Sequence, residues 1–179
     1  MSNYKKIDLA IEEIYELYYR DVYKFLMCFT GNQNDAEDLT QEVFMKVIKS
    51  LSNFNNQCKL KTWIISIAKH TAIDHMRRKK FSIIFKEIFF NQIPSNKKTP
   101  YEILQYSENI KHLYEAIYRL KTKYRTVIIL RGINEFSIKE TAEILCCSES
   151  KVKIDYHRGL ISLKKFLHID NEEVFNNAN

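Results

Sequence analysis

Hydrophobic residues recur every three or four positions along most of the chain, which is the period of an amphipathic α-helix. In the first half, such stripes run over residues 7–29, 36–51 and 60–76. Gly31 follows the first stripe, at a place where glycine commonly ends a helix. The polar run 52–59 has no periodicity. We therefore predict three helices, with a loop at 52–59 before the third.

Two short patterns predict where helices begin. Asn34 has a side chain that caps helix N-termini, and Glu37 follows three residues later, as in a capping box. Ser137 and Glu140 have the same spacing and precede a short apolar stripe that ends at Leu145. We expect the second helix to begin at Asn34 and a short helix to begin at Ser137.

The helical pattern resumes near Ser107 and continues to 132. After the helix that begins at Ser137, the sequence Cys146-Cys147-Ser148 predicts a turn. A last stripe runs from about residue 149 to 167. The second half therefore resembles the first in being built from helices.

The scarcity of turn-forming residues supports this interpretation. The chain has three Gly and two Pro among 179 residues, whereas sandwiches, barrels and propellers need a turn for every short strand. Both prolines, Pro94 and Pro100, lie in one polar segment, where a domain boundary is expected. We predict an all-α protein of two small helical domains joined by a flexible linker: a first domain at 1–80, the linker at 81–106, a second domain at 107–170 and a frayed tail at 171–179.

Residues 81–90 (FSIIFKEIFF) are too apolar for an ordinary exposed linker and too short to span a bilayer. We expect this segment to pack on a partner or on the first domain.

The four cysteines, Cys28, Cys58, Cys146 and Cys147, form no Cys-x-x-Cys pair and have no histidine at zinc-ligand spacing. We interpret them as buried thiols in a reducing compartment, and we expect neither a metal nor a cofactor. The N-terminus has acidic residues where a signal peptide has an apolar core, and no stretch approaches the roughly 20 apolar residues of a membrane span. These features predict a cytoplasmic protein.

Charge is distributed unevenly, although the net charge is only +6. The first fifty residues carry 6 basic and 9 acidic side chains, and the next fifty carry 10 and 2. This division suggests a basic partner at one surface and an anionic partner at another. Solvated helix faces are the alternative for any single run of charge.

The clearest functional pattern lies between residues 137 and 167. Ala142, Cys146 and Val152 place small or apolar residues where two short helices would cross through a tight turn, which predicts a helix-turn-helix. An ordinary helical hairpin with a solvated polar face is the alternative. On the second helix, five polar residues are expected to face outward, toward phosphates and base edges of duplex DNA: Lys151, Lys153, Asp155, His157 and Arg158.

A different mixture of side chains precedes and follows the start of the third helix. Aromatic, amide and basic groups together are typical of a site for unstacked bases. Trp63 fits either the apolar core or a stacking platform. The candidate set is Phe54, Asn55, Asn56, Gln57, Lys59, Lys61, Lys69, Arg77 and Arg78.

Asp38, Gln41 and Glu42 are spaced to share one face of the second helix. Such a face suits a basic partner protein. Acidic residues near a helix start also interact favourably with the helix dipole, so the spacing alone leaves both interpretations open.

Six segments resemble a known family. Residues 35–44 (DAEDLTQEVF), 60–68 (LKTWIISIA) and 71–78 (TAIDHMRR) resemble region 2 of bacterial RNA polymerase sigma factors; 120–128 (LKTKYRTVI), 137–145 (SIKETAEIL) and 148–158 (SESKVKIDYHR) resemble region 4. The two blocks, in this order and joined by a short linker, resemble the extracytoplasmic-function (ECF) class over about residues 10–167.

This resemblance implies a promoter-specificity subunit without catalytic activity. It implies that Asp38, Gln41, Glu42 and Phe44 bind the clamp helices of the largest polymerase subunit. It further implies that the segment from Phe54 through Arg78, with His70, captures a flipped base and holds the melted minus-ten strand. The implied reader of the duplex minus-thirty-five element comprises Ser148, Lys151, Lys153, Asp155, His157 and Arg158.

The same resemblance implies a path for the linker and one further partner. The linker would thread through the polymerase toward the RNA exit channel. An anti-sigma factor, often a membrane protein in this class, would hold the protein inactive.

Some residues depart from the family pattern. Asp155 replaces a residue that is often basic, and we expect it to accept from a cytosine amino group or to pair with Arg158. His70 stands where Asn is common, and Lys121 replaces the usual Pro after Leu120. These departures affect the promoter sequence that is read, not the general role.

Two other classes of function compete with this one. A stand-alone helix-turn-helix repressor with an N-terminal ligand or dimerisation domain would bind duplex DNA tightly without polymerase. An enzyme finds little support, because the sequence has no Gly-rich phosphate loop, and His70 and His75 are five apart, which does not place them on one helix face.

Overall fold

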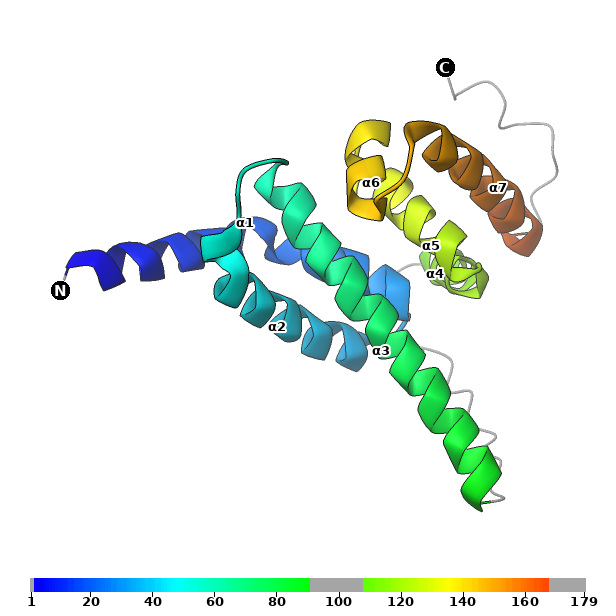
Figure 1. Cartoon of the computed structure of the whole chain (residues 1–179). Helices are drawn as coiled ribbons and strands as arrows, with labels where there is room; N and C mark the ends of the chain where they lie inside the picture. The colour runs from blue at the N-terminus through cyan, green and yellow to red at the C-terminus, as the bar shows by residue number, and fades with distance from the viewer. Residues whose placement is uncertain (1, 91–107, 168–179) are drawn as a thin grey trace. The chain divides into compact units, whose positions relative to one another are not determined.

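The computed structural model describes residues 2–90 and 108–167, and it describes side chains over 11–81 and 112–167. Within these ranges the chain is helical apart from short connections and contains no strand, so the all-α prediction is confirmed (Figure 1). It divides into two compact units, residues 1–103 and 104–179. The predicted tail and residues 91–106 of the predicted linker lie outside the described residues.

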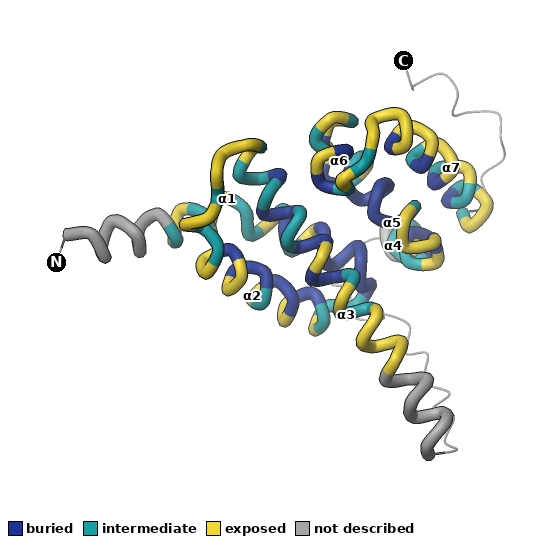
Figure 2. Tube along the Cα trace, viewed as in Figure 1, coloured by how far each residue is buried: buried dark blue, intermediate teal, exposed yellow. Residues whose placement is uncertain are grey.

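Unit 1 is a bundle of three helices: α1 (Ser2–Thr30), α2 (Gln33–Ser50) and α3 (Leu60–Phe90). Each of these helices contacts the other two. The apolar stripes meet in one core, shown in dark blue in Figure 2. Burial of each such side chain contributes roughly 1.5–3 kcal/mol. The fully buried members include Val22, Phe25, Leu26, Phe29, Val43, Val47, Ile64 and Ile65.

The turn between α1 and α2 is set by two neighbouring residues. Gly31 has φ 64°, and its N–H donates to the Met27 carbonyl, so glycine ends α1 as predicted. Asn32, not Asn34, caps α2: its extended backbone suits the capping position, and its Oδ1 accepts from the Asp35 N–H at 2.9 Å. The prediction for Asn34 is wrong because the glycine turn is complete two residues earlier.

The connection to α3 is a loop, as predicted, but it begins with a 3₁₀ turn at Leu51–Asn53. The third helix is longer than its apolar stripe suggested. Its backbone continues to Phe90, so the predicted domain boundary at residue 80 falls inside a helix. The side chains of 82–90 lie outside those described, and the expected packing of 81–90 stays a prediction.

Unit 2 contains α4 (Glu108–Arg119), α5 (Thr122–Ile128), a π-helical turn (Ile129–Ile133), α6 (Ile138–Leu145) and α7 (Glu149–Leu167). Helix α7 packs on α4, α5 and α6. The core includes Ile117, Ile129, Leu130, Ile144 and Val152.

The helix-turn-helix is confirmed at α6 and α7. Ser137 and Glu140 form the predicted capping box, with reciprocal hydrogen bonds of 3.1 and 2.9 Å. Cys146 ends α6 in the left-handed conformation, with φ 51°, and the Cys147 N–H donates to the Ala142 carbonyl. This turn directs the chain into α7.

At the α4–α5 turn, Arg125 is buried and its guanidinium donates to the carbonyls of Tyr118 and Leu120. These hydrogen bonds stabilise the turn at Lys121, the position where the family resemblance leads one to expect a proline. Burial lowers the pKa of Arg125 from its ordinary value, and the guanidinium stays charged because that value is so high.

The cysteines do not all match the prediction of buried thiols. Cys28 is buried, Cys58 and Cys147 are half-buried, and Cys146 is exposed in the turn before α7. Among the described residues, no cluster of three His, Cys, Asp or Glu side chains is arranged to hold a metal ion. The helices described are each too short or too polar to cross a membrane.

Candidate nucleic-acid and partner interfaces

The outer face of α2, which we call the α2 face, consists of Asp38, Gln41, Glu42 and Met45. The first three were predicted from their spacing. Met45 was missed: its side chain is 56% exposed and lies one turn after Glu42 and two turns after Asp38. The sequence feature that could have identified Met45 is its spacing, because it is an apolar residue seven positions after Asp38 on an otherwise polar helix face.

Phe44 does not lie on this outer face, and the polymerase-binding role that the resemblance implied for it stays a prediction. It lies about 120° around the helix from Asp38. It is only 5% exposed and packs on Tyr15 of α1, with ring centroids 4.7 Å apart. Phe44 therefore joins α2 to α1.

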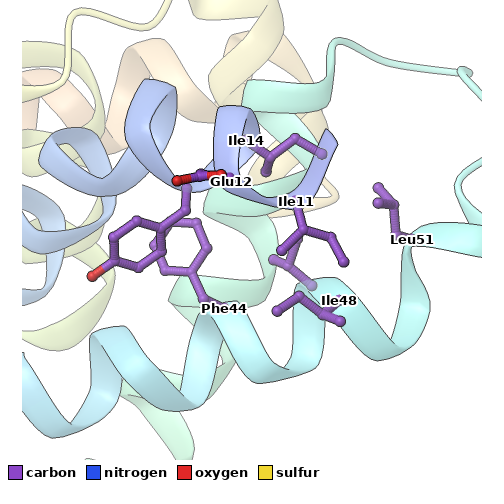
Figure 3. Close-up of a pocket in the computed structure, with 8 residues that line it drawn as sticks. Ile11, Glu12, Ile14, Phe44, Ile48 and Leu51 are labelled. Atoms are coloured by element: carbon purple, nitrogen blue, oxygen red, sulfur yellow. The ribbon is translucent and has the colours of Figure 1, made fainter. Parts of the chain in front are cut away.

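Beside the α2 face, helices α1 and α2 enclose an open apolar groove of about 400 Å³ (Figure 3). Ile11 and Ile14 line it from α1, and Phe44 and Ile48 line it from α2. Ile48 lies two turns from Gln41 on the same side of α2, so the groove adjoins the α2 face.

Acidic residues of α2 pair with basic residues of α3. Glu42 lies 4.0 Å from Arg78 of α3, and it also pairs at 2.7 Å with Lys46 of its own helix. Asp35 lies 2.7 Å from Lys79 and 3.5 Å from the His75 Nε2. The acidic and basic blocks of the sequence thus face one another across the α2–α3 packing.

The loop at 54–59 exposes amide groups around an anchored aromatic ring. Phe54 and Trp63 contact one another with ring centroids 5.0 Å apart, and both are half-buried. Trp63 is therefore neither fully in the core nor fully open, and the choice between the two roles that the sequence left open stays undecided. The side chains of Asn55, Asn56, Gln57 and Lys59 are exposed.

The basic residues of α3 occupy different environments. Lys61 pairs with Asp21 at 2.9 Å, whereas Arg77 and Arg78 are well exposed. Lys69 is only 6% exposed, so the prediction that it faces outward is wrong. It lies four residues after Ile65 and therefore at the edge of the buried stripe.

His70 lies beside Lys69 on the exposed side of α3. Partial burial, and then the neighbouring Lys69 charge, lower the pKa of His70 below its usual value. At neutral pH this imidazole is therefore neutral, and it offers one hydrogen-bond donor and one acceptor.

Helix α7 presents most of the predicted duplex-binding residues. Ser148 precedes it, and its hydroxyl accepts from the Lys151 N–H at 3.3 Å. The side chains of Lys151, Lys153, His157 and Arg158 are exposed. The sequence placed these residues correctly because each lies away from the inward stripe that begins at Val152.

Asp155 is the exception, because it is buried rather than outward-facing. It lies three residues after Val152 and about 60° from it around the helix. Its carboxylate contacts the Lys151 Nζ at 2.8 Å and the Lys123 Nζ at 3.7 Å. The hydrogen bond from Lys151 is the main cause that lowers the pKa of Asp155. Its carboxylate is therefore paired with these two lysines, whereas the sequence suggested a cytosine amino group or Arg158 as its partner.

Two exposed isoleucines on α7 were also missed. Ile154 is 51% exposed and Ile161 is 43% exposed. They are spaced by seven residues and share one side of the helix. Neither was singled out from the sequence. The inward apolar stripe was enough to predict the helix, so apolar residues outside that stripe gave no separate signal.

Comparison with known proteins identifies both units. Residues 14–82 match the model of Sigma-70 region 2, and residues 111–163 match that of Sigma-70 region 4. The chain is 37% identical over 167 residues to the ECF RNA polymerase sigma factor SigX of Bacillus subtilis, covering 90% of this chain and 85% of that protein. It is 31% identical over 166 residues to SigW of the same organism, covering 88% and 89%.

Solved structures share the fold. The sigma factor RpoE of Bartonella quintana, in complex with the anti-sigma factor NepR, matches with TM-score 0.74 and 22% identity over 89% of this chain and 98% of that one. CnrH, in complex with the cytosolic domain of CnrY, matches with TM-score 0.67 and 18% identity over 92% and 91%. With these matches to both regions, the chain belongs to the ECF class of sigma-70 RNA polymerase sigma factors, which direct transcription initiation at specific promoters.

Proposed function

We propose that this sigma factor uses three separate surfaces. The α2 face docks on core RNA polymerase, the loop at 54–59 with α3 holds the melted minus-ten strand, and α7 reads the minus-thirty-five duplex. The observation that carries this proposal is that each family region coincides with a helical unit whose outward side presents the required chemistry.

At the minus-ten element, the driving force is the capture of unstacked bases. A base stacked on an aromatic ring recovers roughly 1–3 kcal/mol, which offsets the cost of opening the duplex. Phe54, held against Trp63, provides an aromatic surface, and the loop amides surround it with donors and acceptors. Arg77 and Arg78 supply positive charge for the strand backbone.

Sigma factors are non-catalytic, and this chain acts by binding and positioning alone. Its proposed location is the cytoplasm, where RNA polymerase transcribes DNA. We further propose an anti-sigma partner, anchored in the membrane. RpoE was solved with the anti-sigma factor NepR, and CnrH was solved with the cytosolic domain of CnrY.

Transcription reconstituted from purified components tests the function. The protein is added to core polymerase on genomic DNA of the organism that encodes it, and transcript ends are mapped. We expect discrete start sites that share an upstream and a downstream element and that vanish without the protein. If no start site depends on the protein, the proposal fails. Tight duplex binding without core polymerase would instead favour a repressor.

The α2 face has its own test in Asp38→Lys. Asp38 takes no part in the ion pairs between α2 and α3 described above, so charge reversal removes a partner contact without breaking them. We expect co-purification with core polymerase to fall by about tenfold or more, since charge reversal at an interface commonly costs several kcal/mol.

Glu16→Lys is the matched control, because it makes the same charge change at an exposed position of α1, outside the α2 face. It is expected to leave co-purification nearly unchanged. Circular dichroism should show equal helicity in both variants. Equal binding by Asp38→Lys and the native protein would remove the α2 face from the mechanism.

A further inference from the structure

The side of α7 that is opposite the core carries a mixed row of residues, which we call the α7 face. It consists of Ser150, Ile154 and His157, all exposed; Figure 2 shows the exposed side of α7 in yellow. Lys153 and Arg158 border it on its two sides. An apolar side chain thus lies at the centre of a basic and polar surface.

Ile154 is not required by the core of unit 2. Val152 of α7 packs with Val127 and Ala142 in a buried cluster. Ile154 follows Val152 by two residues and lies about 160° from it around the helix, away from that cluster. The helix geometry therefore places residue 154 outside the core. Packing within unit 2 does not require an apolar side chain at this position.

The position of Ile154 suits contact with base edges. The turn at Cys146 leads into α7 at Glu149, and Ile154 is the sixth residue of that helix, in its second turn. In a helix-turn-helix, the N-terminal turns of the second helix enter the major groove. Lys153, His157 and Arg158 surround Ile154 with groups that donate to phosphates and base acceptors.

Among the base edges of the major groove, one group is apolar, and it is the C5-methyl of thymine. An exposed isoleucine at the centre of a basic face therefore has one chemically matched target in duplex DNA. We propose that Ile154 is a specificity residue that packs against a thymine methyl group in the upstream promoter element. This proposal rests on the proposed role of α7.

Replacement of thymine by deoxyuracil tests the contact, because it removes only the methyl group. Holoenzyme reconstituted with core polymerase first selects duplexes from a random pool, which defines the upstream element. Its affinity is then measured for the selected duplex and for the same duplex with deoxyuracil at every thymine of that element. We expect the native holoenzyme to lose about fourfold in affinity for each buried methyl group.

Ile154→Ala should bind the thymine duplex more weakly by about the same factor and should no longer distinguish thymine from deoxyuracil. Ile154→Val, which keeps a shorter apolar side chain, should retain part of the discrimination. Ile161→Ala is the matched control: it removes the same atoms from the same helix side about 10 Å along the axis. It should discriminate as the native protein does.

Two results would overturn the proposal. One is a native holoenzyme that binds both duplexes equally, and the other is an Ile154→Ala variant that keeps the full preference for thymine. Failure of the proposed function looks different, because the selected duplexes would then share no upstream element. Ile154 is exposed, and equal circular-dichroism melting curves would show that the variants fold.

Discussion

Asp155 lies beneath the first turns of α7, with a lysine from each of two helices on its carboxylate. Lys151 comes from the same helix, four residues earlier, and Lys123 comes from α5. A carboxylate that is 11% exposed and has two cationic partners contributes to stability.

Asp155→Asn should destabilise unit 2 by about 1–2 kcal/mol at neutral pH, because the amide loses the charge-assisted hydrogen bond. The pKa of Asp155 is lowered in the folded protein. Its contribution is therefore fully present above the unfolded value of about 3.9 and is lost as the pH falls through the lowered folded value. Urea titrations at several pH values, followed by amide NMR signals of unit 2, should show the two proteins converging in acid.

Asp74→Asn provides the comparison, since Asp74 is exposed and lies 3.9 Å from Arg77. Its effect should stay within about 0.5 kcal/mol. A destabilisation by Asp155→Asn that persists unchanged into acid would show that the charge of Asp155 is not its cause.

The packing of α5 against α7 depends on a small residue at one crossing point. A Cβ atom built on Gly159 would lie 3.0 Å from Cγ1 and 3.3 Å from Cδ1 of the buried Ile128. A Cβ on Gly132 would meet only the Tyr156 hydroxyl, at 3.9 Å. The helix packing therefore requires a residue without a Cβ at position 159 but not at position 132.

Gly159→Val should destabilise unit 2 by about 1–3 kcal/mol, because the larger side chain forces α5 and α7 apart. Gly132→Ala, which replaces a glycine where space is open, should be neutral or slightly stabilising. Thermal unfolding of both variants measures the difference. Equal melting temperatures would show that the α5–α7 contact adjusts without cost.

At the scale of the whole molecule, the chain has two separate cores. Ile64 is fully buried in unit 1, and Ile129 is fully buried in unit 2. Ion pairs within unit 1 also connect the α2 face to the basic helix, through Glu42 and Arg78. The surfaces proposed for polymerase and for melted DNA are therefore joined by an ion pair, whereas the proposed duplex reader lies in the other unit.

Ile64→Ala and Ile129→Ala should each cost about 2–5 kcal/mol, and each loss should be confined to one unit. Hydrogen exchange followed by mass spectrometry reports this directly, because protection should fall in 11–81 for the first variant and in 112–167 for the second. A loss of protection in both units from either substitution would mean that the chain unfolds as one cooperative body.

Much of this architecture could be predicted from local patterns. The capping box at Ser137, the glycine end at Gly31 and the turn before α7 depend on residues close in sequence, so they appeared where expected. The start of α2 did not, because Asn32 and Asn34 are both capable caps and the φ of Gly31 decides between them. Helix α3 outlasts its amphipathic stripe because no proline or glycine stops it before Phe90.

The candidate surfaces were predicted less completely. Spacing identified Asp38, Gln41 and Glu42 but omitted the exposed Met45, and the family resemblance added Phe44, which is buried. Lys69 and Asp155 were taken as outward because they are charged, although each lies close to the buried stripe of its helix. Charge type is a weak guide at such borders, where a buried polar group is stable once it has partners.

The sequence by itself determined the helices, their order and the family, because these depend on periodicity, caps and short motifs that a chain carries locally. Only the tertiary structure decided which flank of each helix is covered. A period of 3.6 residues defines faces relative to the axis of one helix, but the width of the buried face depends on the helices that pack against it. That is why Asp155 is buried against Lys123 of another helix, and why Ile154 remains exposed on the α7 face.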